Sequence, residues 1–258
     1  GRSEELIGKI LKDRRDKIVI SSKYGNRENE EGQWFKDLSA EWMVKSLEGS
    51  LKRLNTDYID LYMLHSPNTE YLLDDELVEA LEKQKKLGKI KSWGVSLIPN
   101  GRGIIPADQG INIANQEQPC DFYELRYNLL EREAESKFFP LSIEKDLGII
   151  ARVPLSSGFL TGKYDKEVSF PENDLRSGFG KEKIASLVDK ADKLKFLSEE
   201  LNSSLAQAAL KFCIQQNAVS SVIPGGKNPE QVIQNAEAAD LPDITPEMYN
   251  RIDEILSE

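Results

Sequence analysis

Hydrophobic positions along the chain change their spacing in a regular way. Short runs rich in β-branched and aromatic residues, typical of buried strands, alternate with segments whose apolar residues recur every three or four positions, as in amphipathic helices. We predict six strands, at residues 16–23, 57–65, 90–96, 120–126, 148–153 and 219–223. Helices are predicted at the start of the chain and at 39–54, 74–87, 138–146, 182–201, 204–216, 229–239 and 245–256.

Strands that alternate with helices form a parallel sheet with right-handed crossovers. No Gly-x-Gly-x-x-Gly motif follows a predicted strand, which argues against a Rossmann dinucleotide fold. The even strand spacing is instead typical of an α/β protein of the (β/α)₈ TIM barrel type, which needs two further βα units of roughly 30 residues each. We therefore predict one barrel domain over residues 1–258, with about six of its eight strands in this chain and an N-terminal segment lacking.

Charge and cysteine content narrow the possible partners. The 258 residues carry 34 Lys and Arg against 44 Asp and Glu, a net charge of −10. A protein this acidic repels phosphate backbones at long range, so we expect no nucleic-acid partner. Its two cysteines exclude a disulfide scaffold and a cysteine-rich zinc site, and they fit a cytoplasmic protein. No apolar stretch approaches the ~18 residues of a membrane span and no signal-peptide pattern opens the chain, so no membrane partner is expected.

Two candidate catalytic residues end neighbouring strands, where TIM barrels place their active sites. Lys23 ends the first predicted strand, and His65, the only histidine, ends the second. Burying an ammonium costs several kcal/mol unless it is paired, so Lys23 has a partner or a task, or else it extends along the strand end with its amine in water. A lone histidine is more often structural, but Lys23 beside it favours a shared function. No second histidine or nearby cysteine supports a metal site.

Two glycine loops follow the last strands. Gly225-Gly-Lys227-Asn-Pro229 precedes a helix whose amino end attracts anions, and glycine lets a ligand approach the backbone closely. A simple turn before a proline-started helix is the alternative. The second loop, residues 155–163, follows the fifth strand and contains Gly158. Because barrels often bind phosphate at loops after their late strands, the two loops together indicate a phosphate-bearing ligand.

Taken in order, these motifs resemble the aldo-keto reductase family. The resembling segments are residues 1–5, 19–23, 57–67, 94–96, 127–130, 151–163 and 223–235, of which 57–67 is the most specific. The resemblance implies hydride transfer from a nicotinamide, usually NADPH, to an aldehyde or ketone. It also implies a catalytic tetrad of Asp, Tyr, Lys and His. Lys23 and His65 match two of its members, and the aspartate and tyrosine would precede Gly1.

The resemblance also assigns a set of residues to binding NADP(H). Glu124 stands where the family has a glutamine, and Arg152 stands where many relatives have an aromatic ring. The Arg152 guanidinium could stack on the nicotinamide or pair with Glu124. Lys227 is the candidate for the 2′-phosphate. The full set is Ser96, Glu124, Asn128, Arg152, Leu155, Gly158, Gly225, Lys227, Gln231 and Asn235.

Two functions follow from the resemblance. The first is NADPH-dependent reduction of a small carbonyl compound, impaired in this chain because a general acid such as the tetrad tyrosine contributes ~10²–10⁴ in rate. The alternative is a regulatory or sensor barrel that binds NADP(H) without efficient turnover. The absent tyrosine, Glu124 and Arg152 motivate it. The sequence indicates neither the substrate nor the oligomeric state.

Overall fold

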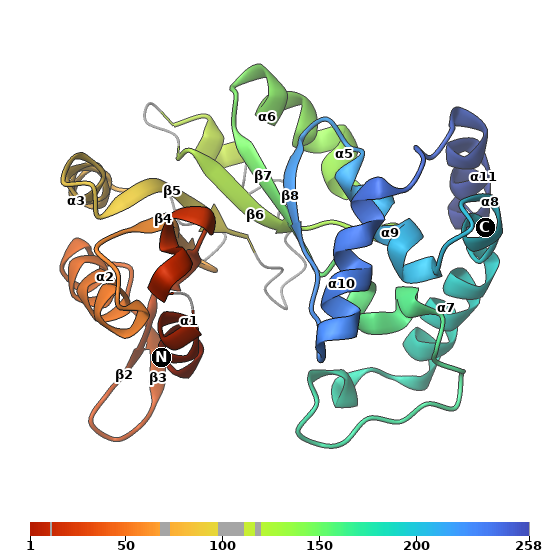
Figure 1. The fold of residues 1–258 in the computed structure, drawn as a ribbon, viewed down its shortest axis with the longest axis horizontal. Helices are drawn as coiled ribbons and strands as arrows, with labels where there is room; N and C mark the ends of the chain where they lie inside the picture. The colour runs from red at the N-terminus through yellow and green to blue at the C-terminus, as the bar shows by residue number, and fades with distance from the viewer. Residues whose placement is uncertain (11, 68–72, 98–110, 117–119, 258) are drawn as a thin grey trace. The chain divides into compact units, whose positions relative to one another are not determined.

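The computed structural model describes residues 1–10, 12–67, 73–97, 111–116 and 120–257 (Figure 1). They form two compact units. The first comprises Gly1–Leu125 and Glu135–Gly148, and the second comprises Arg126–Ala134 and Ile149–Glu258. Each unit is considered by itself below. The organisation of the whole chain as one barrel domain stays a prediction.

Four parallel strands form the sheet of the first unit. They are β1 (Ser21–Tyr24), β4 (Ile59–His65), β5 (Ile90–Ser96) and β6 (Phe122–Arg126), and they pair in that order. The register places His65 opposite Ser96 and Ser96 opposite Glu124, so the carboxyl ends of three neighbouring strands lie level. All four were predicted. The first is shorter than expected, because residues up to Lys17 belong to the 3₁₀ helix η1 (Lys12–Lys17).

Helices of the first unit begin where the sequence offers a cap. Ser39 accepts a hydrogen bond from the Trp42 amide at the start of α2 (Ala40–Leu54), and Asp74 accepts one from the Leu77 amide at the start of α3 (Asp75–Lys86). The remaining helices are α1 (Arg2–Ile10), α5 (Glu133–Lys137) and α6 (Phe139–Glu144). The apolar stripe of α2 is buried, and α2 and α3 pack against β1 and β5 (Figure 1).

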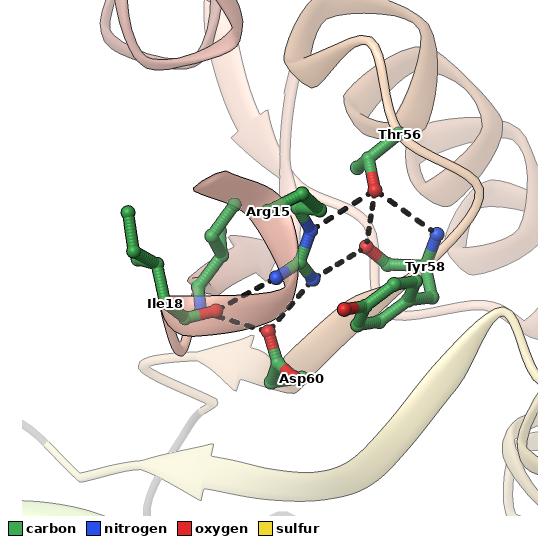
Figure 2. Close-up of polar contacts among 6 residues, drawn as sticks. Arg15, Ile18, Thr56, Tyr58 and Asp60 are labelled. Atoms are coloured by element: carbon green, nitrogen blue, oxygen red, sulfur yellow. Dashed lines mark hydrogen bonds and ion pairs between the residues drawn. The ribbon is translucent and has the colours of Figure 1, made fainter. Parts of the chain in front are cut away.

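One arginine joins the amino ends of β1 and β4 (Figure 2). Its guanidinium donates to the Asp60 carboxylate at 2.7 Å, to the carbonyl oxygens of Ile18 and Tyr58 at 2.8 and 2.9 Å, and to the Thr56 hydroxyl at 3.0 Å. This residue, Arg15, also stacks over the Tyr58 ring at 3.8 Å. The planar guanidinium of Arg15 thereby fixes the amino ends of β1 and β4, and the candidate catalytic residues lie at the carboxyl ends of the strands.

A hairpin that the sequence pattern did not predict follows β1. It consists of β2 (Asn26–Glu28) and β3 (Trp34–Lys36), which pair antiparallel. Gly32 has a φ of +77° in the connecting turn, a conformation that favours glycine. The segment is polar and lacks apolar alternation, so it carries no strand signal. Its position at the end of β1 brings it to the candidate catalytic edge.

The second unit contains two parallel strands, β7 (Gly148–Arg152) and β8 (Val219–Ile223), both of which were predicted. Its helices are η2 (Ser156–Thr161), η3 (Leu175–Gly178), α7 (Lys181–Lys193), α8 (Phe196–Glu200), α9 (Leu205–Ile214), α10 (Pro229–Glu237), η4 (Ala238–Asp240) and α11 (Pro246–Ser257) (Figure 1). The helix predicted over 182–201 is two helices, α7 and α8. Among the described residues, no helix has the length and apolar character needed to cross a membrane.

Candidate active site

A buried carboxylate lies at the centre of the first unit's candidate residues. Glu124, 2% exposed, accepts a hydrogen bond from the Lys23 ammonium at Oε2 (2.8 Å) and one from the Ser96 hydroxyl at Oε1 (2.8 Å). Ser96 is fully buried. Lys23 is on β1 and Glu124 on β6, so the ion pair crosses the carboxyl-end face of the unit. The sequence predicted all three as site residues, and the structure brings them together.

This arrangement gives Lys23 the partner that a lysine at an apolar strand end requires. The Lys23 side chain is 28% exposed and that of Glu124 is 3% exposed, so the pair is largely removed from water. An ion pair in which both carboxylate oxygens are hydrogen-bonded fixes the positions of both side chains. It also occupies the Ser96 hydroxyl, which was predicted to contact a cofactor carboxamide.

His65 lies at the same edge and is held by the β2–β3 hairpin. The side-chain amide nitrogen of Asn26, Nδ2, is 3.1 Å from Nδ1 of the His65 ring. From β3, the Lys36 ammonium donates to the His65 carbonyl oxygen at 2.6 Å. Partial burial lowers the pKa of Lys36. The sequence predicted His65 but missed Asn26 and Lys36, because exposed polar residues on a polar segment carry no motif signal.

In the second unit, Asn128 is committed to structural contacts. It is fully buried, and its amide nitrogen donates to Glu131 Oε2 at 2.8 Å and to the Val153 carbonyl oxygen at 3.0 Å. Val153 directly follows Arg152 at the end of β7 and has a φ of +54°, which is strained for a β-branched residue. Asn128 therefore supports the backbone at the carboxyl end of β7, and its contact with a cofactor stays a prediction.

The loop after β7 has an unusual backbone. Beyond Leu155, φ is +45° at Ser156, +56° at Ser157 and +94° at Gly158, and these residues open η2. Consecutive left-handed residues cost free energy and concentrate in loops that serve a function. Arg176, from η3, donates to the Ser157 carbonyl oxygen at 3.1 Å and so helps to hold this conformation. The sequence did not indicate this role of Arg176.

The last predicted loop lies at the amino end of α10. A Cβ added to Gly225 would meet no atom within 4 Å, so packing does not require glycine there. The Asn228 side chain caps α10 by accepting from the Gln231 amide, and the Gln231 side chain accepts from the Lys227 amide at 2.9 Å. Asn235 donates to the Gly225 carbonyl oxygen at 3.3 Å. The structure thus brings all four predicted residues of this loop, from Gly225 to Asn235, around one helix end.

Charged groups of the α10 loop and of the segment around η3 interact with each other. Hydrogen bonds from Arg176 hold the pKa of Asp174 well below its ordinary value, and the charge of Lys227 lowers it further. Lys227 and Arg176 therefore both act on the Asp174 carboxylate, which lies between the α10 loop and η3. Within the described ranges, no group of three or more His, Cys, Asp or Glu residues is arranged to hold a metal ion.

Comparisons with known proteins identify the family of this chain. The model of the family described as "Aldo/keto reductase family" matches residues 1–257. A probable voltage-gated potassium channel subunit beta from Oryza sativa subsp. japonica is 32% identical, over 99% of this chain and 80% of that protein. The uncharacterized oxidoreductase YqkF from Bacillus subtilis is also 32% identical, over 96% of this chain and 76% of that protein.

Solved structures with the same fold include members of that family. A glycerol dehydrogenase from Gluconobacter oxydans has a TM-score of 0.81 at 27% identity, covering 99% of this chain and 77% of that one. The holo form of an aldo-keto reductase from Bacillus halodurans has a TM-score of 0.71 at 29% identity, covering 98% and 77%. These likenesses confirm the predicted α/β barrel class, with six parallel strands among the described residues. The chain belongs to the aldo/keto reductase family of oxidoreductases.

Proposed function

We propose that this chain reduces a small aldehyde or ketone with NADPH, through Lys23 and His65. The observation that carries the proposal is the buried Lys23–Glu124–Ser96 cluster at the strand edge that His65 also occupies. Burying an ion pair costs desolvation free energy, and the carboxyl ends of barrel strands are where such pairs serve catalysis.

The chemistry of carbonyl reduction gives these residues their roles. NADPH, when bound, would supply a hydride to the carbonyl carbon, and the negative charge left on the carbonyl oxygen would be neutralised by a proton from water. A fixed positive charge and an imidazole at the strand edge stabilise that charge without having to reorganise. Lys23 is the fixed charge in this proposal, and His65 binds the carbonyl oxygen. Glu124 holds Lys23 in position.

The second unit supplies features that fit the nucleotide of NADP(H). The open space at Gly225, the amino end of α10 and the charge of Lys227 suit a phosphate. The diphosphate is assigned to the left-handed loop Ser156–Gly158 that Arg176 holds, because barrels often bind phosphate at loops after their late strands. We propose that Leu155, Gln231 and Asn235 line the same nucleotide site and that Arg152 meets the nicotinamide. The two cysteines, Cys120 and Cys213, are buried and not disulfide-bonded, which supports a reducing compartment such as the cytoplasm.

The direct test is consumption of NADPH by the 258-residue chain. Absorbance of the reduced nicotinamide is followed over a panel of aldehydes and ketones, with protein-free and substrate-free controls. We expect turnover that depends on the carbonyl compound and is slow, by the ~10²–10⁴ that a tyrosine general acid contributes. NADPH that binds but is not oxidised by any compound on the panel would contradict the reductase proposal.

That outcome would favour the alternative, a sensor that binds NADP(H) without efficient turnover. The buried Glu124 supports this alternative, because a carboxylate cannot donate a hydrogen bond to a carboxamide oxygen as a glutamine can. The rice relative, a probable voltage-gated potassium channel subunit beta, also supports a regulatory role for this chain.

Preference for NADPH over NADH depends on Lys227 in this proposal. A Lys227→Met variant is expected to bind NADPH about tenfold more weakly, since a charge-assisted hydrogen bond to phosphate contributes ~1.5–3 kcal/mol. Its affinity for NADH should stay within twofold of the wild type, because NADH has no 2′-phosphate. Fluorescence titration with both nucleotides measures the two dissociation constants. Lys181→Met, at the exposed start of α7, is the matched control. Equal weakening toward both nucleotides would show that Lys227 does not select the phosphate.

A further inference from the structure

The β2–β3 hairpin holds His65 at two points. Asn26, the first residue of β2, places its Nδ2 3.1 Å from Nδ1 of the ring, and Lys36, the last residue of β3, donates to the carbonyl oxygen of the same histidine at 2.6 Å. Asn26 and Lys36 are opposite each other in the hairpin register. The two contacts therefore come from one cross-strand residue pair of the hairpin, and they fix both the side chain and the backbone of His65.

Gly25 places the hairpin this close to His65. It has a φ of +118°, which favours glycine, and a Cβ there would lie 2.7 Å from the Leu38 side chain and 3.6 Å from the backbone nitrogen and oxygen of His65. The chain turns at Gly25 directly after β1 ends at Tyr24. A side chain at position 25 would push the hairpin away from the strand end. The sequence is therefore adapted locally to bring Asn26 to the ring.

The chemistry of the Asn26–His65 contact assigns the ring proton. An amide nitrogen only donates hydrogen bonds, so the ring nitrogen that faces it must accept. A neutral imidazole that accepts at Nδ1 carries its proton at Nε2. Of the described charged side chains at this edge, the Lys23 and Lys36 ammonium groups are hydrogen-bond donors, and the Glu124 carboxylate oxygens accept from Lys23 and Ser96.

We propose that Asn26 is a positioning residue that fixes His65 in the tautomer with its proton at Nε2. The ring then presents an N–H donor at Nε2, the hydrogen bond that the proposed role of His65 at a carbonyl oxygen requires. To that extent the inference rests on the proposed function. The assignment of the tautomer does not, because it follows from the Asn26 contact in the free protein.

The single histidine makes a direct test available. In protein labelled with ¹⁵N at histidine, every ring-nitrogen resonance belongs to His65. The spectrum is recorded without nucleotide near pH 8, where an ordinary histidine with a pKa of about 6.5 is neutral. We expect a protonated Nε2 and an unprotonated Nδ1 in the wild type. A proton at Nδ1, or rapid exchange between the two tautomers, would overturn the inference.

An Asn26→Asp variant reverses the polarity of the contact. A carboxylate only accepts, so Nδ1 should now carry a proton, either as the other tautomer or as the imidazolium. Asn29→Asp makes the same chemical change on the same hairpin, at a side chain that is hydrogen-bonded to Gln33, and it should leave the ring spectrum unchanged. Lys36→Met should also leave the tautomer unchanged, because Lys36 donates to the backbone carbonyl oxygen of His65 rather than to its ring. An unprotonated Nδ1 in Asn26→Asp would overturn the inference.

Kinetics separate positioning from a general structural role. We expect Asn26→Asp to lower kcat/KM for the best aldehyde by roughly 10–100-fold, the loss usual when the partner that orients a functional histidine is removed. NADPH affinity should stay within twofold of the wild type. If the tautomer behaves as expected and no aldehyde is reduced by any variant, the proposed function fails and the tautomer assignment stands. If the wild-type ring carries its proton at Nδ1, the inference fails whatever the activity.

Discussion

Lys23→Met is expected to destabilise the first unit by about 3 kcal/mol, the lower end of the range for breaking a buried ion pair. The variant removes the ammonium that pairs with Oε2 of the Glu124 carboxylate, whose side chain is only 3% exposed. All three tryptophans, Trp34, Trp42 and Trp93, lie in the first unit, so tryptophan fluorescence during urea unfolding reports on that unit alone.

The relative losses in the free energy of unfolding show whether the buried charge, or merely a lost contact, destabilises the variants. Glu124→Gln leaves an ammonium that is 28% exposed and can recruit water, so it should cost only about 1–2 kcal/mol. The double variant Lys23→Met/Glu124→Gln removes both charges and should recover to within about 1 kcal/mol of Glu124→Gln alone. Lys89→Met, which breaks an exposed ion pair with Glu48 in the same unit, should cost less than about 1 kcal/mol. Additive losses in the double variant would contradict the buried-charge explanation.

Arg15→Met is expected to cost about 3 kcal/mol in the free energy of unfolding of the same unit. It removes a guanidinium that bonds Asp60, Thr56 and two backbone carbonyls (Figure 2). These acceptors are at most partly accessible to water, and the Asp60 carboxylate, with a side chain 20% exposed, loses its cation while still accepting from the Ile20 amide. Hydrogen bonds to charged groups contribute ~1.5–3 kcal/mol each when they are shielded.

An Arg15→Lys variant distinguishes the contribution of the positive charge to stability from that of the guanidinium geometry. Arg15→Lys keeps the charge but lacks the planar fork, so it should recover no more than about half of the loss. Hydrogen exchange at the amides of β1 and β4 should quicken more than exchange in the second unit. Arg14→Met alters the exposed neighbour and should stay within about 0.5 kcal/mol of the wild type. Full recovery in Arg15→Lys would mean that charge alone is responsible.

Much of the fold could be predicted because its signals are local. Ser39 and Asp74 cap helices as their sequence positions indicate, and Gly88, with a φ of +74°, follows the end of α3. The β2–β3 hairpin was missed because its residues do not alternate between apolar and polar. The division between α7 and α8 at Leu194 was missed because no glycine or proline marks it. These features depend on packing against distant residues, which local periodicity does not contain.

The candidate site was predicted as a set of residues but not as a set of contacts. The resemblance identified Lys23, Ser96 and Glu124, but Lys23 and Glu124 are 101 residues apart and no spacing rule pairs them. The cofactor contact of Asn128 stays a prediction, and its hydrogen bond to the Val153 carbonyl oxygen had no signal in the sequence. Asn26 had no signal at all, since a single exposed asparagine becomes meaningful only when a histidine lies beside it.

Transfer of deuterium is the most direct measurement of what this chain does. The protein is incubated with an aldehyde and NADPH deuterated at C4, each C4 position being labelled in turn, and the alcohol is analysed by mass spectrometry. We predict an alcohol carrying one deuterium on the former carbonyl carbon, from one of the two labelled nucleotides only, even if turnover is slow. Alcohol without deuterium from either nucleotide, or no alcohol beyond the protein-free control, would contradict the assignment of this chain as a carbonyl reductase.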